Sequence, residues 1–161
     1  MLHINIICIG KLKEQYLKDA LNEYSKRLYK YCSLKIIELP DEKVPENLNA
    51  NIINKIKEIE SNNILSHIKN NSYTIALDLH GKQLSSEEFS LKIENIALNN
   101  NSNINFIIGG TLGLSDKLLK QATELISFSK MTFPHHQLIR VFLLEQIFRA
   151  FKILSNEKYH H

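Results

Sequence analysis

Apolar runs alternate along the chain with segments in which apolar positions recur every three or four residues. Five runs are apolar almost throughout, as strands covered on both faces are, and they span Leu2–Ile9, Leu34–Leu39, Tyr73–Leu79, Ile104–Ile108 and Leu125–Phe128. Five segments have a helical period, and they span Gln15–Lys30, Asn49–Lys69, Ser85–Asn99, Ser115–Ala122 and Gln137–Leu154. This alternation predicts an α/β fold with a mainly parallel sheet and helices on both of its faces.

The length of 161 residues and the hydrophobic content of 43% fit one well-packed core, so we expect residues 1–161 to form a single domain. No apolar run approaches the ~18 residues that cross a bilayer, and Leu2–Ile9 lacks the flanks of a signal peptide. We therefore expect a cytoplasmic protein with no membrane partner. Cys8 and Cys32 lie in apolar surroundings without metal or redox spacing, so we interpret them as buried thiols and expect no metal.

The net charge of +3 lies entirely in the last part of the chain. Residues 1–129 carry fifteen Lys or Arg and fifteen Asp or Glu, whereas residues 130–161 carry five and two. Four of the seven histidines also lie in this last part. A local basic excess is typical of a surface that meets phosphates, because neutralising phosphates releases their counterions. A solvated basic tail is the alternative that charge alone leaves open.

Three of the five glycines gather directly after a predicted strand. Gly109, Gly110 and Gly113 follow Ile104–Ile108 and precede the helix that begins near Ser115. Open α/β sheets bind ligands at such carboxyl ends, where backbone without a Cβ can approach a ligand closely. The spacing matches neither the dinucleotide fingerprint nor the P-loop, so it indicates no dinucleotide or nucleoside triphosphate. A tight strand-to-helix turn is the structural alternative.

Two further segments are candidates for the same site. Residues 78–82, Asp-Leu-His-Gly-Lys, also follow an apolar strand, although a solvated turn explains them equally well. Residues 127–136 are neither periodic enough for a helix nor short enough for a tight turn, and a helix that is apolar around much of its circumference follows them. Burial of such a helix needs more than one face of a monomer, so we expect a homodimer.

The order of these motifs is similar to that of a known family. The chain has Phe-Ile-Ile-Gly-Gly at 106–110 with Gly113, Ile-Ser-Phe-Ser-Lys-Met-Thr-Phe-Pro-His at 126–135, Arg-Val-Phe-Leu-Leu-Glu-Gln-Ile-Phe-Arg-Ala-Phe at 140–151 and Tyr-His at 159–160. Together with Ile-Gly-Lys-Leu-Lys at 9–13, they resemble the SPOUT-class methyltransferases that act on N3 of a pseudouridine in 23S ribosomal RNA. The chain departs from the family pattern at one place. The family usually has a single histidine and one residue fewer between the proline and the arginine, whereas here both His135 and His136 precede Arg140.

The resemblance implies a C-terminal trefoil knot whose loops bind S-adenosylmethionine. The residues that it assigns to the cofactor are Leu77, Gly109, Gly113, Phe128, Ser129, Lys130, Met131, Thr132 and Phe133. These belong to the glycine loop and to the 127–136 segment, together with the strand that precedes the 78–82 loop. Backbone amides and carbonyls in such loops can read an adenine edge without particular side chains.

The resemblance also implies the residues that handle the base and the RNA. We expect Arg149, Tyr159 and His160, with Glu145 holding Arg149, to orient the base and to absorb the charge of its imide. The implied partners are 23S ribosomal RNA within the ribosome and a second copy of the chain, and the residues expected to bind RNA are His136, Arg140 and Lys158. Two alternatives are a ribosome-associated module without catalysis and, less favoured because phosphate motifs are missing, an enzyme that uses another nucleotide.

Overall fold

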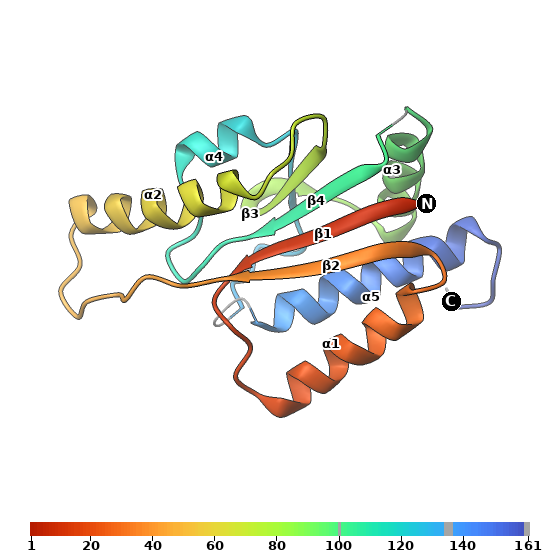
Figure 1. Cartoon of the computed structure of the whole chain (residues 1–161), viewed down its shortest axis with the longest axis horizontal. Coiled ribbons are helices and arrows are strands. Elements are labelled where there is room, and N and C mark those ends of the chain that lie inside the picture. Colours follow the sequence, from red (N-terminus) through yellow and green to blue (C-terminus); the bar gives the residue numbers. More distant parts are fainter. Residues whose placement is uncertain (100, 134–136, 160–161) are drawn as a thin grey trace.

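Five parallel strands form the centre of the protein in the order β2-β1-β4-β3-β5 (Figure 1). The computed structural model describes residues 1–99, 101–133 and 137–159. The strands are β1 (Leu2–Ile9), β2 (Cys32–Leu39), β3 (Tyr73–Gln83), β4 (Asn103–Ile108) and β5 (Glu124–Ser127). The helices are α1 (Gln15–Leu28), α2 (Ala50–Ser66), α3 (Ser86–Leu98), α4 (Asp116–Gln121) and α5 (Gln137–Leu154). The predicted alternation and the parallel sheet are confirmed.

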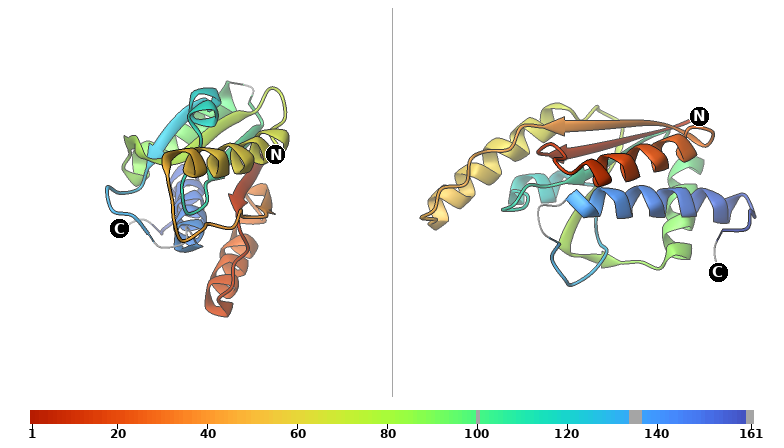
Figure 2. Two further views of the ribbon diagram at one scale, coloured as in Figure 1. Left: turned by 90° about the vertical axis from the view of Figure 1, so that its left-hand side faces the viewer. Right: turned by 90° about the horizontal axis from the view of Figure 1, so that it is seen from below.

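Helices cover both faces of the sheet, because side chains of successive strand residues point to opposite faces. Ile4 and Ile6 of β1 belong to a core with α1, α3 and α5, whereas Ile7 and Ile9 belong to a smaller core with α2 and α4. Figures 1 and 2 show α1 and α5 together on one side of the sheet and α2 and α4 on the other. The strands are apolar almost throughout because both faces of the sheet pack against a core.

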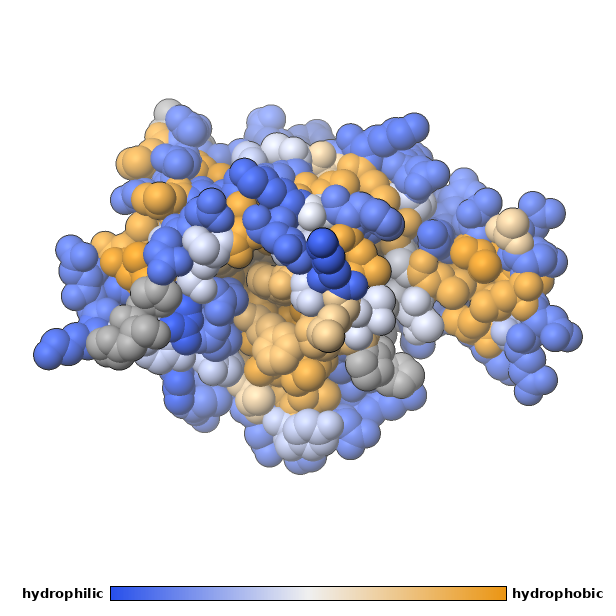
Figure 3. Space-filling view, turned by 180° about the vertical axis from the view of Figure 1, so that it is seen from behind, coloured by the Kyte–Doolittle hydropathy of each residue, from blue (hydrophilic) through white to orange (hydrophobic). Residues whose placement is uncertain are grey.

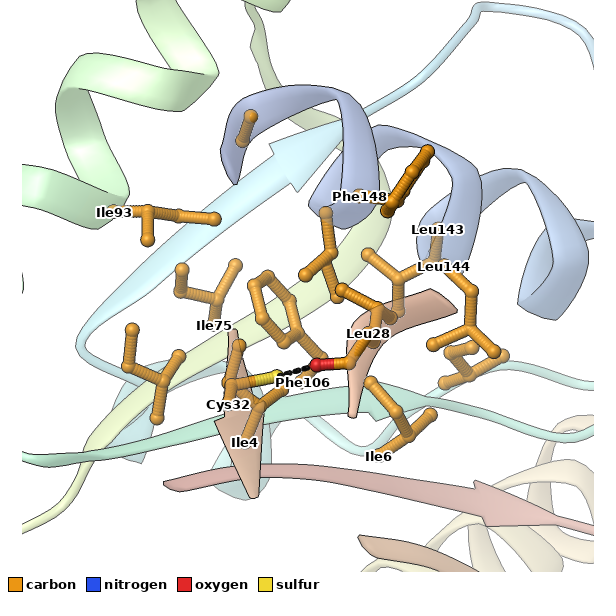
Figure 4. Close-up of a cluster of buried hydrophobic side chains, with 14 of the residues drawn as sticks. Ile4, Ile6, Leu28, Cys32, Ile75, Ile93, Phe106, Leu143, Leu144 and Phe148 are labelled. Carbon is orange, nitrogen blue, oxygen red and sulfur yellow. Dashed lines mark hydrogen bonds between the residues drawn. The ribbon is translucent and has the colours of Figure 1, made fainter. Parts of the chain in front are cut away.

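The larger core is built around Phe106 and the inner side of α5 (Figure 4). Leu143, Leu144 and Phe148 of α5 are buried there against α1 and the sheet. The Cys32 thiol donates to the carbonyl oxygen of Leu28 at 3.9 Å (Figure 4). Burial raises the pKa of this thiol to about 11, so it stays protonated at neutral pH.

Cys8 is the second buried thiol of the chain. Burial, the largest cause, raises its pKa also to about 11, although the nearby Arg140 acts in the opposite direction. The interpretation of both cysteines as buried thiols is therefore confirmed. Thiols held protonated in this way are poor nucleophiles.

Strand β3 runs four residues beyond its predicted end at Leu79, because it returns to β5 after a bulge. Leu77 and Lys82 both pair with Ile126, so the residues between them form the bulge. A Cβ on Gly81 would lie 2.5 Å from the carbonyl carbon of Ile126. The glycine therefore permits a close approach of two backbones, a constraint that the sequence pattern did not reveal.

A capping box stabilises the start of α3. The Ser85 hydroxyl accepts a hydrogen bond from the Glu88 amide at 3.1 Å, and the Glu88 carboxylate accepts one from the Ser85 amide at 2.8 Å. Asn49 caps α2 in a simpler way, since its side chain accepts from the Ile52 amide at 2.9 Å. In the described part of the chain, no helix is long and apolar enough to span a membrane.

Candidate active site

The carboxyl ends of β3, β4 and β5 surround a cavity of about 640 Å³. Its walls come from the β3 bulge, the glycine loop, the segment after β5 and the first turn of α5. The three loops singled out in the sequence thus meet at one site, because parallel strands end at the same edge of the sheet. The volume falls in the range of small-molecule sites, about 300–1,000 Å³.

The glycine loop presents backbone to this cavity. Gly113 has a φ of +86°, where L side chains are strained, and a Cβ there would meet no atom within 4 Å. The amide of Gly113 donates to the carbonyl of Gly110 at 3.0 Å, which closes the turn. Ser115 then caps α4, because its side chain accepts from the Leu118 amide at 3.2 Å. The loop is therefore both open to a ligand and fixed at its two ends.

Eight of the nine residues expected to bind the cofactor line the cavity, namely Leu77, Gly109, Gly113, Phe128, Ser129, Met131, Thr132 and Phe133. Lys130 does not line it. A Cβ on Gly109 would lie 3.0 Å from the side chain of Leu114, so this glycine also serves packing inside the loop. The cavity walls otherwise follow the sequence-based expectation closely.

The cavity also contains charged residues beyond those that the resemblance assigned to the cofactor. Lys57 comes from α2, Asp116 from α4, and Asp78 from the start of the β3 bulge. The Asp78 carboxylate accepts from the His80 amide at 2.9 Å and lies 3.3 Å from Nδ1 of the same histidine. The signal for Asp78 and His80 was their place after an apolar strand, but Lys57 belongs to a helix remote in sequence and had no such signal.

Local hydrogen bonds shape the segment after β5. The Ser127 hydroxyl donates to the Ser129 carbonyl at 2.8 Å, and the Ser129 hydroxyl accepts from the Met131 amide at 3.0 Å. Serine side chains therefore hold this segment in a turn without helix or strand. Phe133 packs edge-on against Phe142 of α5, with ring centroids 5.5 Å apart.

A second cavity of about 380 Å³ adjoins the first. The two share Ile126, Ser127, Phe128 and Phe133 as walls. The other walls of the second cavity come from α5 and from α3 with the two residues before it, and they include both apolar and polar side chains. Hydrophobic residues also surround a hollow on the face opposite to that of Figure 1 (Figure 3).

Glu145, Arg149 and Tyr159, which were expected to act together, lie in contact. The Nε and Nη2 atoms of Arg149 lie 3.0 and 2.7 Å from Oε1 of Glu145. The Tyr159 hydroxyl donates to the same oxygen at 3.4 Å, and the Arg149 guanidinium lies 4.9 Å from the centre of the Tyr159 ring. The hydrogen bond that Arg149 donates to Glu145 raises the pKa of Arg149, and burial raises the pKa of Tyr159. Both side chains therefore keep their protons at neutral pH.

The structure corrects the assignment of Arg140 to RNA binding. Arg140 is 1% exposed, and its Nη1 binds the Glu38 carboxylate at 2.8 Å. Its Nη2 donates to the carbonyls of Ile9 and Gly10 at 2.8 and 2.9 Å, and its buried Nε has no partner among the described residues. The guanidinium thus ties the start of α5 to the end of β1, and it is not presented to a phosphate. The sequence spacing showed the helix but not this burial.

The remaining expected residues lie near the chain end or outside the described residues. Lys158 is exposed next to Tyr159, as an RNA-binding lysine would be. His136 and His160 lie outside the described residues. Within the described ranges, no group of three or more His, Cys, Asp or Glu is arranged to hold a metal ion.

Comparisons with known proteins point to one family. The family model described as "Predicted SPOUT methyltransferase" matches residues 2–160. A Clostridium botulinum protein named "Ribosomal RNA large subunit methyltransferase H" is 60% identical over 159 residues, 99% of either chain. A Clostridium perfringens protein named "Ribosomal RNA large subunit methyltransferase H 1" is 57% identical over the same length and coverage.

A solved structure supports the fold. It is described as that of a probable methylase family protein from Haemophilus influenzae, and it aligns with 98% of this chain and 70% of its own chain at a TM-score of 0.55. The sequence identity of 11% is so low that this likeness concerns the fold alone.

Proposed function

The chain belongs to the SPOUT methyltransferase family, and we propose on this premise that it methylates N3 of a pseudouridine in 23S ribosomal RNA. It is an enzyme, and the methyl donor of the family is S-adenosylmethionine. The relatives named for the large ribosomal subunit are similar over nearly the whole chain, so their RNA class is the one proposed here. The glycine-walled cavity at the strand ends is the observation that carries this function.

The cavity has the chemistry that S-adenosylmethionine requires. Leu77, Phe128 and other apolar walls suit the adenine ring, and the backbone of Gly109 and Gly113 leaves room for close contact. Asp78 is an acceptor for ribose hydroxyls or the amino group of the donor. When bound, S-adenosylmethionine supplies a methyl group on a positively charged sulfur, which is already activated for transfer.

The main task left to the chain is to hold the two reactants in line. Such positioning is worth up to ~7–11 kcal/mol of the barrier. The imide nitrogen of the base must also lose its proton before its lone pair takes the methyl group. We propose that the Glu145–Arg149–Tyr159 cluster faces the base, with the Arg149 cation stabilising the anionic imide. His160 is proposed to act with this cluster, and no residue is assigned as the general base.

The assembly around the site is also proposed. We expect one domain over residues 1–161 that is closed by a trefoil knot, and a homodimer in the cytoplasm that acts on RNA within the ribosome. Leu138 and Phe142 support the dimer, because they are 37% and 39% exposed on the side of α5 turned away from the core. Lys158 and His136 are proposed to contact RNA, whereas Arg140 is not.

Titration calorimetry with S-adenosylmethionine tests the cofactor assignment. We expect saturable binding by the unmodified protein and at least about tenfold weaker binding after Gly113→Val, because a branched side chain at a φ of +86° strains the loop and enters the cavity. The exposed Asn22→Ala in α1 is the control. A folded protein without affinity for S-adenosylmethionine would support the alternative of a non-catalytic RNA-binding module.

A further inference from the structure

A chain of hydrogen bonds follows the wall of the second cavity, and Gln146 lies at its centre. The Gln146 Nε2 donates to Oε2 of Glu145 at 2.6 Å, and the Ser86 hydroxyl donates to Oε1 of Gln146 at 2.7 Å. Gln146 and Ser86 both line the cavity. These hydrogen bonds therefore connect the start of α3 to the Glu145–Arg149–Tyr159 cluster.

These contacts fix which way the Gln146 amide points. A carboxylate is only an acceptor, so the group facing Glu145 must be the amide nitrogen and the group facing Ser86 must be the carbonyl. A side-chain amide offers two N–H donors and two lone pairs, and the bonds to Glu145 and Ser86 use one of each. One donor and one acceptor of an oriented amide remain for a ligand.

The second cavity is placed to receive the group that accepts the methyl. It shares Phe128 and Phe133 with the first cavity, which we assign to S-adenosylmethionine and call the cofactor cavity. A ring that occupies the second cavity therefore lies beside the methyl donor. Its volume of about 380 Å³ and its aromatic side chains suit a flat heterocycle extruded from an RNA strand. Gln146 is then a polar side chain of the wall with a free donor and a free acceptor for one edge of that ring.

We propose that Gln146, oriented by Ser86, recognises the N1–H and C2=O edge of pseudouridine. This inference rests on the proposed function and names what distinguishes its substrate. Pseudouridine is joined to ribose through carbon, so its N1 carries a hydrogen beside the C2 carbonyl. Uridine presents a C–H and a carbonyl at the corresponding edge. The amide oxygen accepts from N1–H and the amide nitrogen donates to C2=O. Uridine can form only the second of these two hydrogen bonds, because it has a C–H in place of the N–H.

The assignment leaves the reacting nitrogen accessible. N3 lies on the other side of C2 from N1, so an amide bound to the N1 edge does not cover N3. The second hydrogen bond is the source of discrimination, because an amide oxygen that faces a C–H in a closed site loses a partner. Gln146 therefore acts as a specificity residue, and Ser86 acts as the residue that positions it.

The test compares ribosomes that carry pseudouridine at the target position with ribosomes that carry uridine there. We expect the unmodified protein to have at least about tenfold higher kcat/KM on the first. Gln146→Leu should reduce this ratio at least about tenfold, mainly by loss of activity on pseudouridine, and Ser86→Ala should reduce it about threefold. Gln121→Leu, on the exposed side of α4, is the matched control and should keep the ratio.

A structural role for Gln146 would give a different result. It would lower activity on both substrates alike and would weaken S-adenosylmethionine binding, whereas we expect that affinity to stay within about twofold. If Gln146→Leu does not fold, Ser86→Ala alone decides. An unchanged ratio in the folded variants, or no preference in the unmodified protein, overturns the inference. Absence of any methyl transfer by the unmodified protein would instead overturn the proposed function, and this inference with it.

Discussion

Oε1 of Glu60 lies 2.8 Å from the position that a Cβ on Gly110 would occupy. Glu60 is 5% exposed, and its other oxygen accepts from the Glu42 amide at 3.0 Å. Its neighbour Ser61 accepts from the Ser115 amide at 2.9 Å, beyond the other end of the same loop. Two buried polar residues of α2 therefore support the glycine loop from outside the cofactor cavity, and Gly110 is required for packing against one of them.

Gly110→Ala should weaken S-adenosylmethionine binding at least about tenfold and lower the thermal midpoint, because the new methyl group pushes against the Glu60 carboxylate. Calorimetry and thermal unfolding measure the two effects. The double variant Glu60→Ala, Gly110→Ala removes the clash and should recover part of the affinity relative to Gly110→Ala. Losses that simply add in the double variant would show that the two residues are not coupled.

The stability of the protein should depend on the charge of Glu60. Burial, the largest cause, and the nearby carboxylates of Asp41 and Glu42 raise its pKa above the ordinary 4.5, although the hydrogen bond from the Glu42 amide acts in the opposite direction. A group with a raised folded pKa stabilises the fold below its unfolded pKa and loses that contribution as the pH rises through the folded value.

Glu60→Gln should therefore be at least as stable as the unmodified protein at pH 7.5, since an amide oxygen can still accept from Glu42. Its advantage should shrink as the pH falls toward 4.5. Thermal unfolding across this range is the measurement, with the exposed Glu23→Gln as the control. If the stability of the variant relative to the unmodified protein were lower at pH 7.5 than at pH 4.5, the predicted direction of the pH dependence would be wrong.

The proposed dimer is best probed at Phe142. Phe142 is 39% exposed on α5, so an aspartate there should leave the monomer folded and shift the mass from near twice 18.7 kDa to near 18.7 kDa. Phe148, a residue of the same apolar helix, is unsuitable, because it is 6% exposed inside the monomer core. Leu91→Asp on α3, where the leucine is 55% exposed, is the control. A mass near 18.7 kDa for the unmodified protein in light scattering would rule the dimer out.

Tyr159→Phe separates the hydroxyl from the ring. The ring packs edge-on against Phe148 at 4.9 Å, so deletion of residues 159–161 should cost stability as well as activity. The phenylalanine keeps that packing and loses the hydroxyl, with its hydrogen bonds to Glu145 and Tyr24. Methyl transfer should fall at least about tenfold while the thermal midpoint and S-adenosylmethionine affinity stay nearly unchanged. Full activity of Tyr159→Phe would remove the hydroxyl from the reaction.

The sequence predicted elements and loops better than long-range packing. Leu2–Ile9 and Gln137–Leu154 match the structure at both ends, because hydrophobic period and strand composition are local properties. The family resemblance is confirmed by the comparisons. Arg140 was wrongly assigned to RNA and the close approach at Gly81 was not predicted, since these roles depend on Glu38 and Ile126, which lie far away in the sequence. A pattern along one chain does not show which distant backbone a residue will meet.

The second cavity was also not predicted from the sequence. Gln146 had no sequence signal, because a glutamine on a helix is ordinary and only the fold brings Ser86 to its carbonyl. The predicted contacts of Glu145 with Arg149 are local, at four residues apart on one helix, and they were found. The family resemblance therefore implied the Glu145–Arg149 pair, which local helix spacing allows, and tertiary structure was needed for the proposed specificity residue.

The proposed methyl transfer to N3 of a pseudouridine in 23S ribosomal RNA can be measured with purified components. The most direct measurement incubates the purified protein and S-adenosylmethionine carrying a heavy methyl group with ribosomes from cells that lack this gene, followed by mass mapping of the RNA. We expect one heavy methyl group per ribosome on a single pseudouridine of the large-subunit RNA, and none when S-adenosylmethionine is omitted. A heavy methyl on any other nucleotide, or none on ribosomal RNA from a protein that binds S-adenosylmethionine, would contradict the proposed methylation of pseudouridine.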